Sequence, residues 1–340
     1  MTTTTSAAPP HRRSRLGRSD LTWVPLVADG VPPIDLAAKP PPGRHAELTT
    51  RSGPLRLHLR ETPGPSPLAP TAVHLHGLAG SSTNWTDLAG LLAGRMRSIA
   101  LDLPGFGHSE PPPGYAFTRQ ANADVVIRFL EQLDAGPVHL SGNSFGAAVA
   151  IEVAALRPDL VASLVLISPA MPDLRLDPRR LSDPRIAVAM VPVLGNRTRR
   201  ELAMVPPAAR AEQLLRLCFA EPDAVPPHRL AEAVAEFEER GRLSWSGPAL
   251  GRTTVELLRS WLVPPARSLW RRLPEVGAPS LVVWGSADRV VTVRKAPRTA
   301  MLLPRGRLLV LPRTGHVAQM ERPRVVARAF LGLVQAGSRW

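Results

Sequence analysis

Cysteine is almost absent from this sequence, since Cys218 is the single one in 340 residues. One thiol forms no disulfide within the chain, and it supplies neither a redox pair nor a pair of thiolate ligands for a metal. Any intrachain disulfide is therefore excluded. The default location for such a chain is the cytoplasm, and we expect a cytoplasmic protein.

Long apolar runs are absent as well. No stretch approaches the roughly 18 residues that a membrane-spanning helix needs, and a hydrophobic content of 44% is that of a soluble globular protein. Arg12, Arg13 and Arg15 resemble a twin-arginine leader, but the apolar segment that follows, residues 21–28, is short and is interrupted by Pro25. The N-terminus therefore predicts no signal peptide.

Lysine and tyrosine are scarce, although the formal net charge is +14. Lys39 and Lys295 are the only lysines, and the arginines that carry the charge are scattered rather than grouped with aromatic residues. Stacking platforms for nucleic acid need such groups, so we expect no nucleic-acid partner. A solvated arginine-rich surface is the simplest interpretation, while attraction of an anionic substrate or a membrane surface stays open.

Proline, in contrast, is abundant, with 38 residues. Pairs and triplets of proline within residues 9–42 prevent continuous helix or strand, so residues 1–45 are expected to form a mostly disordered tail. Apolar residues at 23–27 offer a segment that can dock on the protein or on lipid, but a loose tail is the simpler interpretation.

Short apolar runs alternate with helical periodicity from residue 46 onward. Runs at 46–50 and 55–60 predict a hairpin at a sheet edge, and Thr118 is expected to cap a helix. Strands separated by helices imply right-handed crossovers and a mainly parallel sheet covered on both faces, which is an α/β fold. Further strands are predicted at residues 71–76, 97–101, 138–140, 160–168, 279–284 and 307–311.

The alternation stops between residues 171 and 277, where three amphipathic helical patterns are separated by prolines. Short helices cannot bury their apolar stripes alone, so these must pack on one another and on the sheet. We therefore predict one sheet domain made of residues 46–170 and 278–340, with a helical cap insertion at 171–277. The predicted apolar stripes are Ala211, Leu214, Leu215 and Cys218; Leu230, Val234 and Phe237; and Val255, Leu258, Trp261 and Leu262.

Residues 142–146 read G-N-S-F-G and fit the pattern G-x-S-x-G, with Ser144 at its centre. An apolar run precedes them and a segment without helix breakers follows, which predicts strand, tight turn and helix. So sharp a turn strains its central residue, and Gly142 and Gly146 allow strand and helix to pass closely. The turn would lift the Ser144 hydroxyl above the end of the sheet as a nucleophile. A plain strand-to-helix turn is the structural alternative.

A serine hydroxyl is a weak nucleophile and needs a base within reach and a carboxylate that orients this base. In a parallel sheet, groups that converge lie at the carboxyl ends of strands. Asp288 and His316 each follow a late strand, and we predict them to form a catalytic triad with Ser144. Asp173, after the strand at 160–168, is the rival acid. Otherwise Asp288 is a turn residue and His316 a surface histidine.

An oxyanion formed on attack by Ser144 needs N–H donors that are already in place. We expect one from Phe145, directly after the nucleophile, and one from Leu78, just after a His-Gly dipeptide. His74 and His76 share one face of a predicted strand, as metal ligands can. Because no third ligand lies near them, we expect a structural role at the oxyanion loop and no metal.

These segments together resemble the α/β-hydrolase superfamily over residues 46–335. The resemblance rests on H-G at 76–77, D-L-P-G-F-G-H-S at 102–109, the turn at 142–146, G-S-A-D at 285–288 and G-H at 315–316, in the chain order Ser, Asp, His. It implies a cap over a serine-dependent active site, with Ser144, Asp288 and His316 catalytic and Leu78 and Phe145 in the oxyanion hole. Serine at the turn departs from the dehalogenase and epoxide-hydrolase branches, which use aspartate there.

The G-N-S-x-G pattern also resembles the carbon-carbon bond hydrolases of aromatic ring-cleavage pathways. The aromatic residues usual around their histidine are missing, because Val317 and Met320 occupy these places, and Ala147 replaces a common glycine. This branch is the second candidate.

We therefore expect a serine hydrolase that cleaves a carboxylic ester, or a thioester or amide, through an acyl-enzyme on Ser144. The chemistry requires no cofactor and no metal. A small apolar acyl compound is the expected substrate, since aromatic residues of the insertion can line a cleft. Two alternatives stay open, a carbon-carbon bond hydrolase and a non-catalytic protein that keeps the cleft as a ligand pocket.

Overall fold

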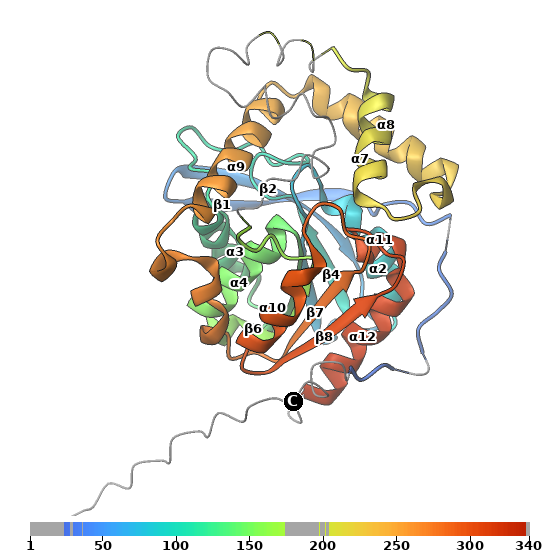
Figure 1. Ribbon diagram of the computed structural model, residues 1–340, viewed down its shortest axis with the longest axis vertical. Coiled ribbons are helices and arrows are strands. Elements are labelled where there is room, and N and C mark those ends of the chain that lie inside the picture. The colour runs from blue at the N-terminus through green and yellow to red at the C-terminus, as the bar shows by residue number, and fades with distance from the viewer. Residues whose placement is uncertain are drawn as a thin grey trace, which may run out of the picture.

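The computed structural model describes residues 24–27, 30–35, 37–173, 197, 201 and 204–337. Its centre is a single sheet of eight strands with helices on both faces (Figure 1). The strands are β1 Gly43–Thr50, β2 Gly53–Thr62, β3 Thr71–Leu75, β4 Arg97–Leu101, β5 Val138–Asn143, β6 Val161–Ile167, β7 Ser280–Gly285 and β8 Gly306–Leu311.

The strand order is β1-β2-β4-β3-β5-β6-β7-β8. The predicted hairpin forms the edge, with β1 antiparallel to β2 and β2 antiparallel to β4, and all remaining neighbours are parallel. Parallel neighbours need crossover connections, and helices provide them on both sides of the sheet. The predicted α/β fold is confirmed.

The helices and 3-10 turns divide between the two faces of the sheet and the connection from β6 to β7. Thr118 caps one helix as predicted, because its hydroxyl accepts the N–H of Ala121 at 3.1 Å. The α-helices are α2 Thr86–Leu92, α3 Arg119–Leu133, α4 Phe145–Leu156, α7 Pro207–Cys218, α8 Pro227–Arg242, α9 Ser246–Trp261, α10 Ala296–Leu302, α11 Ala318–Glu321 and α12 Pro323–Ala336. The 3-10 turns are η1 Ser82–Trp85, η2 Pro158–Leu160, η4 Pro222–Ala224, η5 Pro265–Arg267, η6 Leu269–Arg271, η7 Leu273–Glu275 and η8 Val293–Lys295.

Two apolar cores lie on opposite faces of the sheet. Successive residues of a strand point to opposite faces, so Val282 and Trp284 pack in the core that contains α3, α4 and α10. Leu281 and Val283 pack in the other core, with α2 and α12. Burial on both faces holds the central parallel strands in one register, and their carboxyl ends therefore form a fixed edge.

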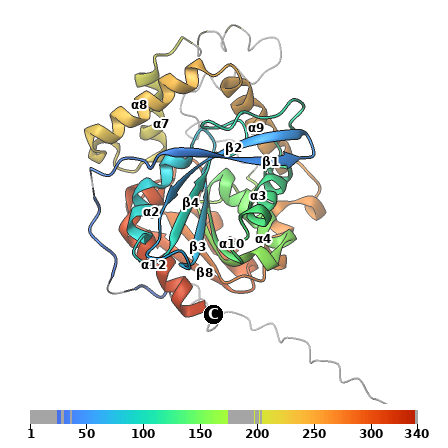
Figure 2. The same ribbon diagram turned by 180° about the vertical axis from the view of Figure 1, so that it is seen from behind.

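Helices α7, α8 and α9 lie together beyond one edge of the sheet (Figures 1 and 2). Helix α9 buries a different face from the one we predicted. Ala249, Thr253 and Leu257 are its buried residues, whereas Leu262 of the predicted stripe is 72% exposed. Because Ala249 is small, α9 lies close to the backbone at Gly105. This close packing, and not the position of the largest apolar side chains, determines which face of α9 is buried.

Residues 24–27, within the segment expected to be a loose tail, lie against α12. The N–H of Val27 donates to the carbonyl of Arg328, and the Arg328 guanidinium donates to the carbonyl of Val27 at 2.7 Å. Val27 is buried among the side chains of the α2 and α12 core. In the described part of the chain, no helix has both the length and the apolar character needed to span a bilayer.

Candidate active site

Ser144 lies at the sharp turn between β5 and α4. Its φ is +53°, a left-handed conformation that is strained for any residue with a side chain. A Cβ on Gly146 would overlap the carbonyl oxygens of Leu75 and His76, and one on Gly142 would lie 2.5 Å from the backbone of Ala147. Because backbone atoms cannot yield, both positions require glycine. The turn therefore has the local form that the sequence pattern predicted.

His316 and Asp288 lie at the carboxyl ends of β8 and β7 and are in contact. Nδ1 of His316 is 2.9 Å from Oδ2 of Asp288, and both side chains are buried. Oδ1 of Asp288 accepts the N–H groups of Val290 and Val291, which fixes the carboxylate. A carboxylate accepts and does not donate, so Nδ1 of His316 carries the proton and Nε2 is left as the basic atom.

Asp173, the rival acid, is engaged elsewhere. Its Oδ1 is 3.5 Å from the ammonium group of Lys295. His316 donates its hydrogen bond to Asp288, so the geometry favours Asp288 as the orienting acid.

The loop of His316 is joined to the turn of Ser144 by a side-chain hydrogen bond and to α7 by a backbone hydrogen bond. Asn143, directly before Ser144, donates its side-chain N–H to the carbonyl of His316 at 3.0 Å. The N–H of His316 in turn donates to the carbonyl of Cys218, at the end of α7, at 2.6 Å. Ser144 and His316 are both buried, at 6% and 4% exposure, and the bond from Asn143 places the loop of His316 against the turn of Ser144.

Glu321 anchors the same loop from the other side. One carboxylate oxygen accepts the N–H of Gly315 at 2.6 Å and the other accepts the N–H of Ala220 at 3.0 Å. Burial raises the pKa of Glu321, and the two N–H groups oppose that rise. Glu321 therefore connects the histidine loop to the segment after α7, a role that sequence reasoning did not assign to it.

The loop after β3 forms a turn in which Leu78 and Ala79 are the central residues. The N–H of Gly80 donates to the carbonyl of Gly77 at 3.0 Å, and Ala79 has a φ of +57°. These features are those of a type II turn, which leaves the N–H of its second residue, here Leu78, outside the closing bond. A Cβ on Gly77 would lie 3.1 Å from Cβ of Ser144, so this turn passes directly beside the nucleophile.

His76 supports this turn through two hydrogen bonds. Nε2 of His76 accepts the N–H of Leu103 at 2.9 Å, so Nδ1 carries the proton and donates to the carbonyl of Gly77 at 2.7 Å. Burial lowers the pKa of His76, which keeps the ring neutral. His74 is bonded to Ser141, and within the described ranges no three His, Cys, Asp or Glu residues gather as a metal site would require.

Phe145 is the first residue of α4. The first N–H groups of a helix have no partner within the helix, so the N–H of Phe145 is available beside Ser144. Leu78 and Phe145 therefore lie on the two segments that flank Ser144.

Asp102 is a further organising residue that sequence reasoning did not single out. Its Oδ1 accepts the N–H of Ser82 at 2.6 Å, while its Oδ2 accepts the N–H of His108 at 2.9 Å and lies 2.7 Å from Nδ1 of His58. Burial acts to raise the pKa of Asp102, but the hydrogen bond from His58 and the neighbouring histidines lower it well below its usual range. The Asp102 carboxylate therefore links the loop after β3 to the loop after β4 through hydrogen bonds.

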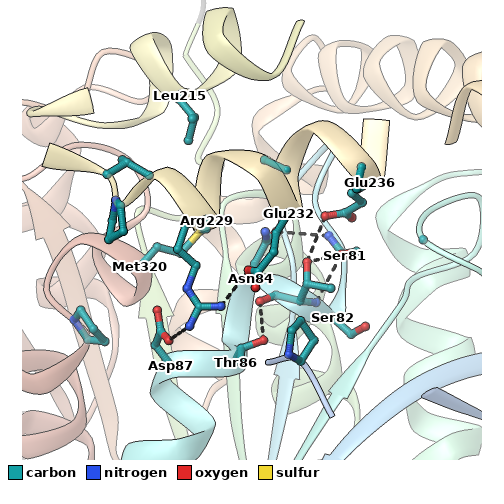
Figure 3. Close-up of a pocket in the computed structure, with 18 of the residues that line it drawn as sticks. Ser81, Ser82, Asn84, Thr86, Asp87, Leu215, Arg229, Glu232, Glu236 and Met320 are labelled. Atoms are coloured by element: carbon teal, nitrogen blue, oxygen red, sulfur yellow. Dashed lines mark hydrogen bonds and ion pairs between the residues drawn. The ribbon is translucent and has the colours of Figure 1, made fainter. Parts of the chain in front are cut away.

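A cavity of about 470 Å³ lies between α8 and the segment from Ser81 to Asp87 (Figure 3). Leu215 and Phe219 of the insertion and Met320 beyond His316 contribute to its apolar lining. Ser144 and His316 are not among its lining residues, although Ser81 follows the Leu78 turn closely and Met320 follows His316. The cavity therefore adjoins the candidate site. Its polar wall includes Arg229, Glu232, Glu236, Glu239 and Arg240 from α8.

Cys218 does not compete as a nucleophile. Burial, followed by the charges of Asp288 and Glu321, raises the pKa of its thiol to about 12. The thiolate is the reactive form, and it is therefore scarce at neutral pH.

A family model for the alpha/beta hydrolase fold matches residues 70–323, and the chain belongs to this family. The chain is 31% identical over 264 residues to the dihydrolipoyllysine-residue acetyltransferase component of an acetoin cleaving system from Pseudomonas putida, a match that covers 77% of this chain and 63% of that protein. The chain thus spans less than two thirds of this relative's length.

Two further similar proteins have names that describe different activities. The chain is 25% identical over 287 residues to 2-hydroxy-6-oxononadienedioate/2-hydroxy-6-oxononatrienedioate hydrolase from Cupriavidus pinatubonensis, with 82% of this chain and 91% of that protein covered. Among solved structures, a membrane phospholipase A described as a bacterial virulence factor has a TM-score of 0.67 and 26% identity, with 88% of this chain and 87% of that chain covered. The named activities of these three proteins differ from one another, so the comparisons leave the substrate of this chain open.

Proposed function

We propose that the protein is a serine hydrolase that transfers the acyl group of an ester to water through an acyl-enzyme on Ser144. The observation that supports this most is the 2.9 Å contact of His316 with Asp288, on a loop that Asn143 bonds to the turn of Ser144. In this proposal α7, α8 and α9 form the cap over the site.

The reaction begins when Oγ of Ser144 attacks the acyl carbon and passes its proton to Nε2 of His316. Asp288 stabilises the imidazolium through Nδ1, while the N–H groups of Leu78 and Phe145 hold the negative oxygen. The carbon-oxygen bond to the alcohol then breaks, and the alcohol leaves with the proton from His316. A water molecule adds to the acyl-enzyme with His316 again as base, which releases the acid and restores Ser144.

The cavity beside the site supports an acyl group with an apolar portion, because burial of apolar surface is the main source of affinity for such a group. We expect p-nitrophenyl esters of graded chain length to be hydrolysed with kcat/KM rising from acetate toward medium chains. Steady-state release of p-nitrophenol measures this trend, and Ser144→Ala is the blank. Equal rates across the series would contradict an apolar acyl site.

Carbon-carbon bond hydrolysis is the second candidate, favoured by the relative from Cupriavidus pinatubonensis and by the G-N-S-F-G turn. Turnover of a vinylogous diketone, with no activity on aryl esters, would support it over the ester proposal. The absorbance of the dienolate chromophore follows this reaction directly.

Leu78→Pro tests the proposed oxyanion hole with little change to the backbone. Proline is favoured at the second position of a type II turn, and the preceding Gly77 tolerates it, so the turn is expected to remain. Only the N–H of residue 78 is lost, and removal of one such donor lowers kcat by about 10² to 10³. Ester kinetics together with a thermal melt measure this. Leu78→Ala, which keeps the N–H, is the control and is expected to retain kcat within about threefold.

A further inference from the structure

Helix α8 contacts the segment after β3 near both of the helix's ends. Near its start, Arg229 reaches Asp87 of α2 at 2.5 Å (Figure 3). Near its end, the Arg240 guanidinium donates to the carbonyl of Ala79. The first contact reaches a helix beside the cavity, whereas the second reaches the turn that presents Leu78.

Arg240 is itself held in place by Glu236, one helical turn earlier. The other terminal nitrogen of its guanidinium donates to Oε1 of Glu236, and Oε2 of Glu236 accepts the hydroxyl of Thr83 at 3.0 Å. Helix α8 thus holds the loop at residue 79 and again at residue 83. A planar guanidinium bonded at both ends has little freedom to move.

The carbonyl that Arg240 binds belongs to the one strained residue of the turn. Ala79 adopts a φ of +57°, a left-handed conformation that is unfavourable for a residue with a Cβ. Arg240 holds the peptide between Ala79 and Gly80, because the Ala79 carbonyl belongs to that peptide. The N–H of the same peptide donates to the Gly77 carbonyl, which shares a peptide plane with the N–H of Leu78. Without an outside contact, a rotation that relieves Ala79 would weaken this closing bond and leave the N–H of Leu78 free to turn. A charge-assisted hydrogen bond is strong enough to oppose this rotation.

We propose that Arg240 is a positioning residue that acts through Ala79: its bond to the Ala79 carbonyl keeps the N–H of Leu78 directed at the oxyanion when α8 is in place. The proposal rests on the proposed ester hydrolysis. If Arg240 has this role, the oxyanion hole is complete only when the insertion is docked on the sheet domain. A side chain of the cap then affects the rate of the chemical step.

Arg240→Met tests this, with Arg229→Met as the matched control on the same helix. The two arginine side chains are similarly buried, at 13% and 16% exposure, and each binds one helix carboxylate and one core group. Both variants loosen α8 and are expected to raise KM. Only Arg240→Met is expected to lower kcat, by about tenfold to a hundredfold, since a misdirected donor costs less than a lost one.

The affinity for an alkyl boronic acid provides the second readout, because both arginines line the cavity and loss of packing weakens binding equally in both variants, whereas a misdirected oxyanion donor weakens it further in Arg240→Met alone. Such a compound forms a tetrahedral adduct with the serine and occupies the oxyanion site. Its Ki is expected to rise in Arg240→Met by the same factor as kcat/KM, and Arg240→Lys, which restores one charged donor, is expected to recover part of the loss. Equal effects of Arg240→Met and Arg229→Met on kcat and Ki would overturn the proposal.

The same measurements separate this proposal from the proposed function. If the wild-type protein neither hydrolyses esters nor binds the boronic acid, while Ser144→Ala behaves identically, the ester hydrolase itself is refuted. If the wild type is active and Arg240→Met retains its kcat, only the role of Arg240 is refuted.

Discussion

His316→Ala is expected to lower kcat for ester hydrolysis by about 10⁶-fold, which is the size of effect seen when the base of a serine triad is removed. Nε2 of His316 is the basic atom that Asp288 orients through Nδ1. Without it, Ser144 has no group to receive its proton, and the leaving alcohol has none to supply one. The residual rate would come from the oxyanion donors and from binding alone.

Steady-state kinetics on an activated ester measure this loss, with circular dichroism to establish that the variant is folded. His228→Ala is the matched control, because His228 is an exposed histidine on α8 and lies outside the cavity lining. It is expected to keep wild-type kcat. A His316→Ala protein that is folded and retains more than about 1% of kcat would contradict the role of His316 as base.

The second large effect concerns stability. Asp102→Ala is expected to lower the free energy of unfolding by about 3 to 5 kcal/mol, since three donors lose their buried acceptor, at about 1 to 3 kcal/mol for each unsatisfied group. The Asp102 side chain is 1% exposed beside His58, and it also accepts the backbone N–H groups of Ser82 and His108. Urea unfolding at pH 7 measures the difference. Asp159→Asn, at a fully exposed carboxylate, is expected to leave the midpoint unchanged.

The pKa of Asp102 gives this prediction a pH dependence. Burial alone would raise that pKa, but the hydrogen bonds from His58 and from the N–H of His108 help to lower it below the unfolded value of 3.8. A lowered pKa means that the unfolded chain binds the proton more tightly, so the carboxylate stabilises the fold above pH 3.8 and loses this contribution as the pH falls below it. The difference between wild type and Asp102→Asn is therefore expected to shrink from pH 5 toward pH 3. A constant difference would contradict the assigned pKa direction.

The turn at Ser144 and the pairing of Asp288 with His316 were predictable because local rules control them. Strand, glycine and helix follow one another within a few residues at Ser144, and parallel strands bring their carboxyl ends to one edge wherever they lie in the sequence. The strand alternation therefore sufficed to place residues 144, 288 and 316 at the same edge of the sheet.

The contacts of the insertion were not predictable in this way. Arg240 and Ala79 are 161 residues apart, and the spacing of Arg229, Glu232, Glu236 and Arg240 on α8 fits a solvated charged face as well as it fits a contact. The buried face of α9 depends on close backbone approach at Ala249, which apolar periodicity does not record. Asp102 begins a Gly- and Pro-rich loop, where an aspartate is usual as a turn residue, so the sequence did not indicate that it accepts three hydrogen bonds.

The most direct test of a nucleophilic Ser144 is peptide mass spectrometry after brief reaction with an alkyl fluorophosphonate. The account predicts one adduct per chain, located on Ser144, with labelling abolished in Ser144→Ala and slowed by orders of magnitude in His316→Ala. Adduct on another residue, or equal labelling of folded wild-type and Ser144→Ala proteins, would contradict it.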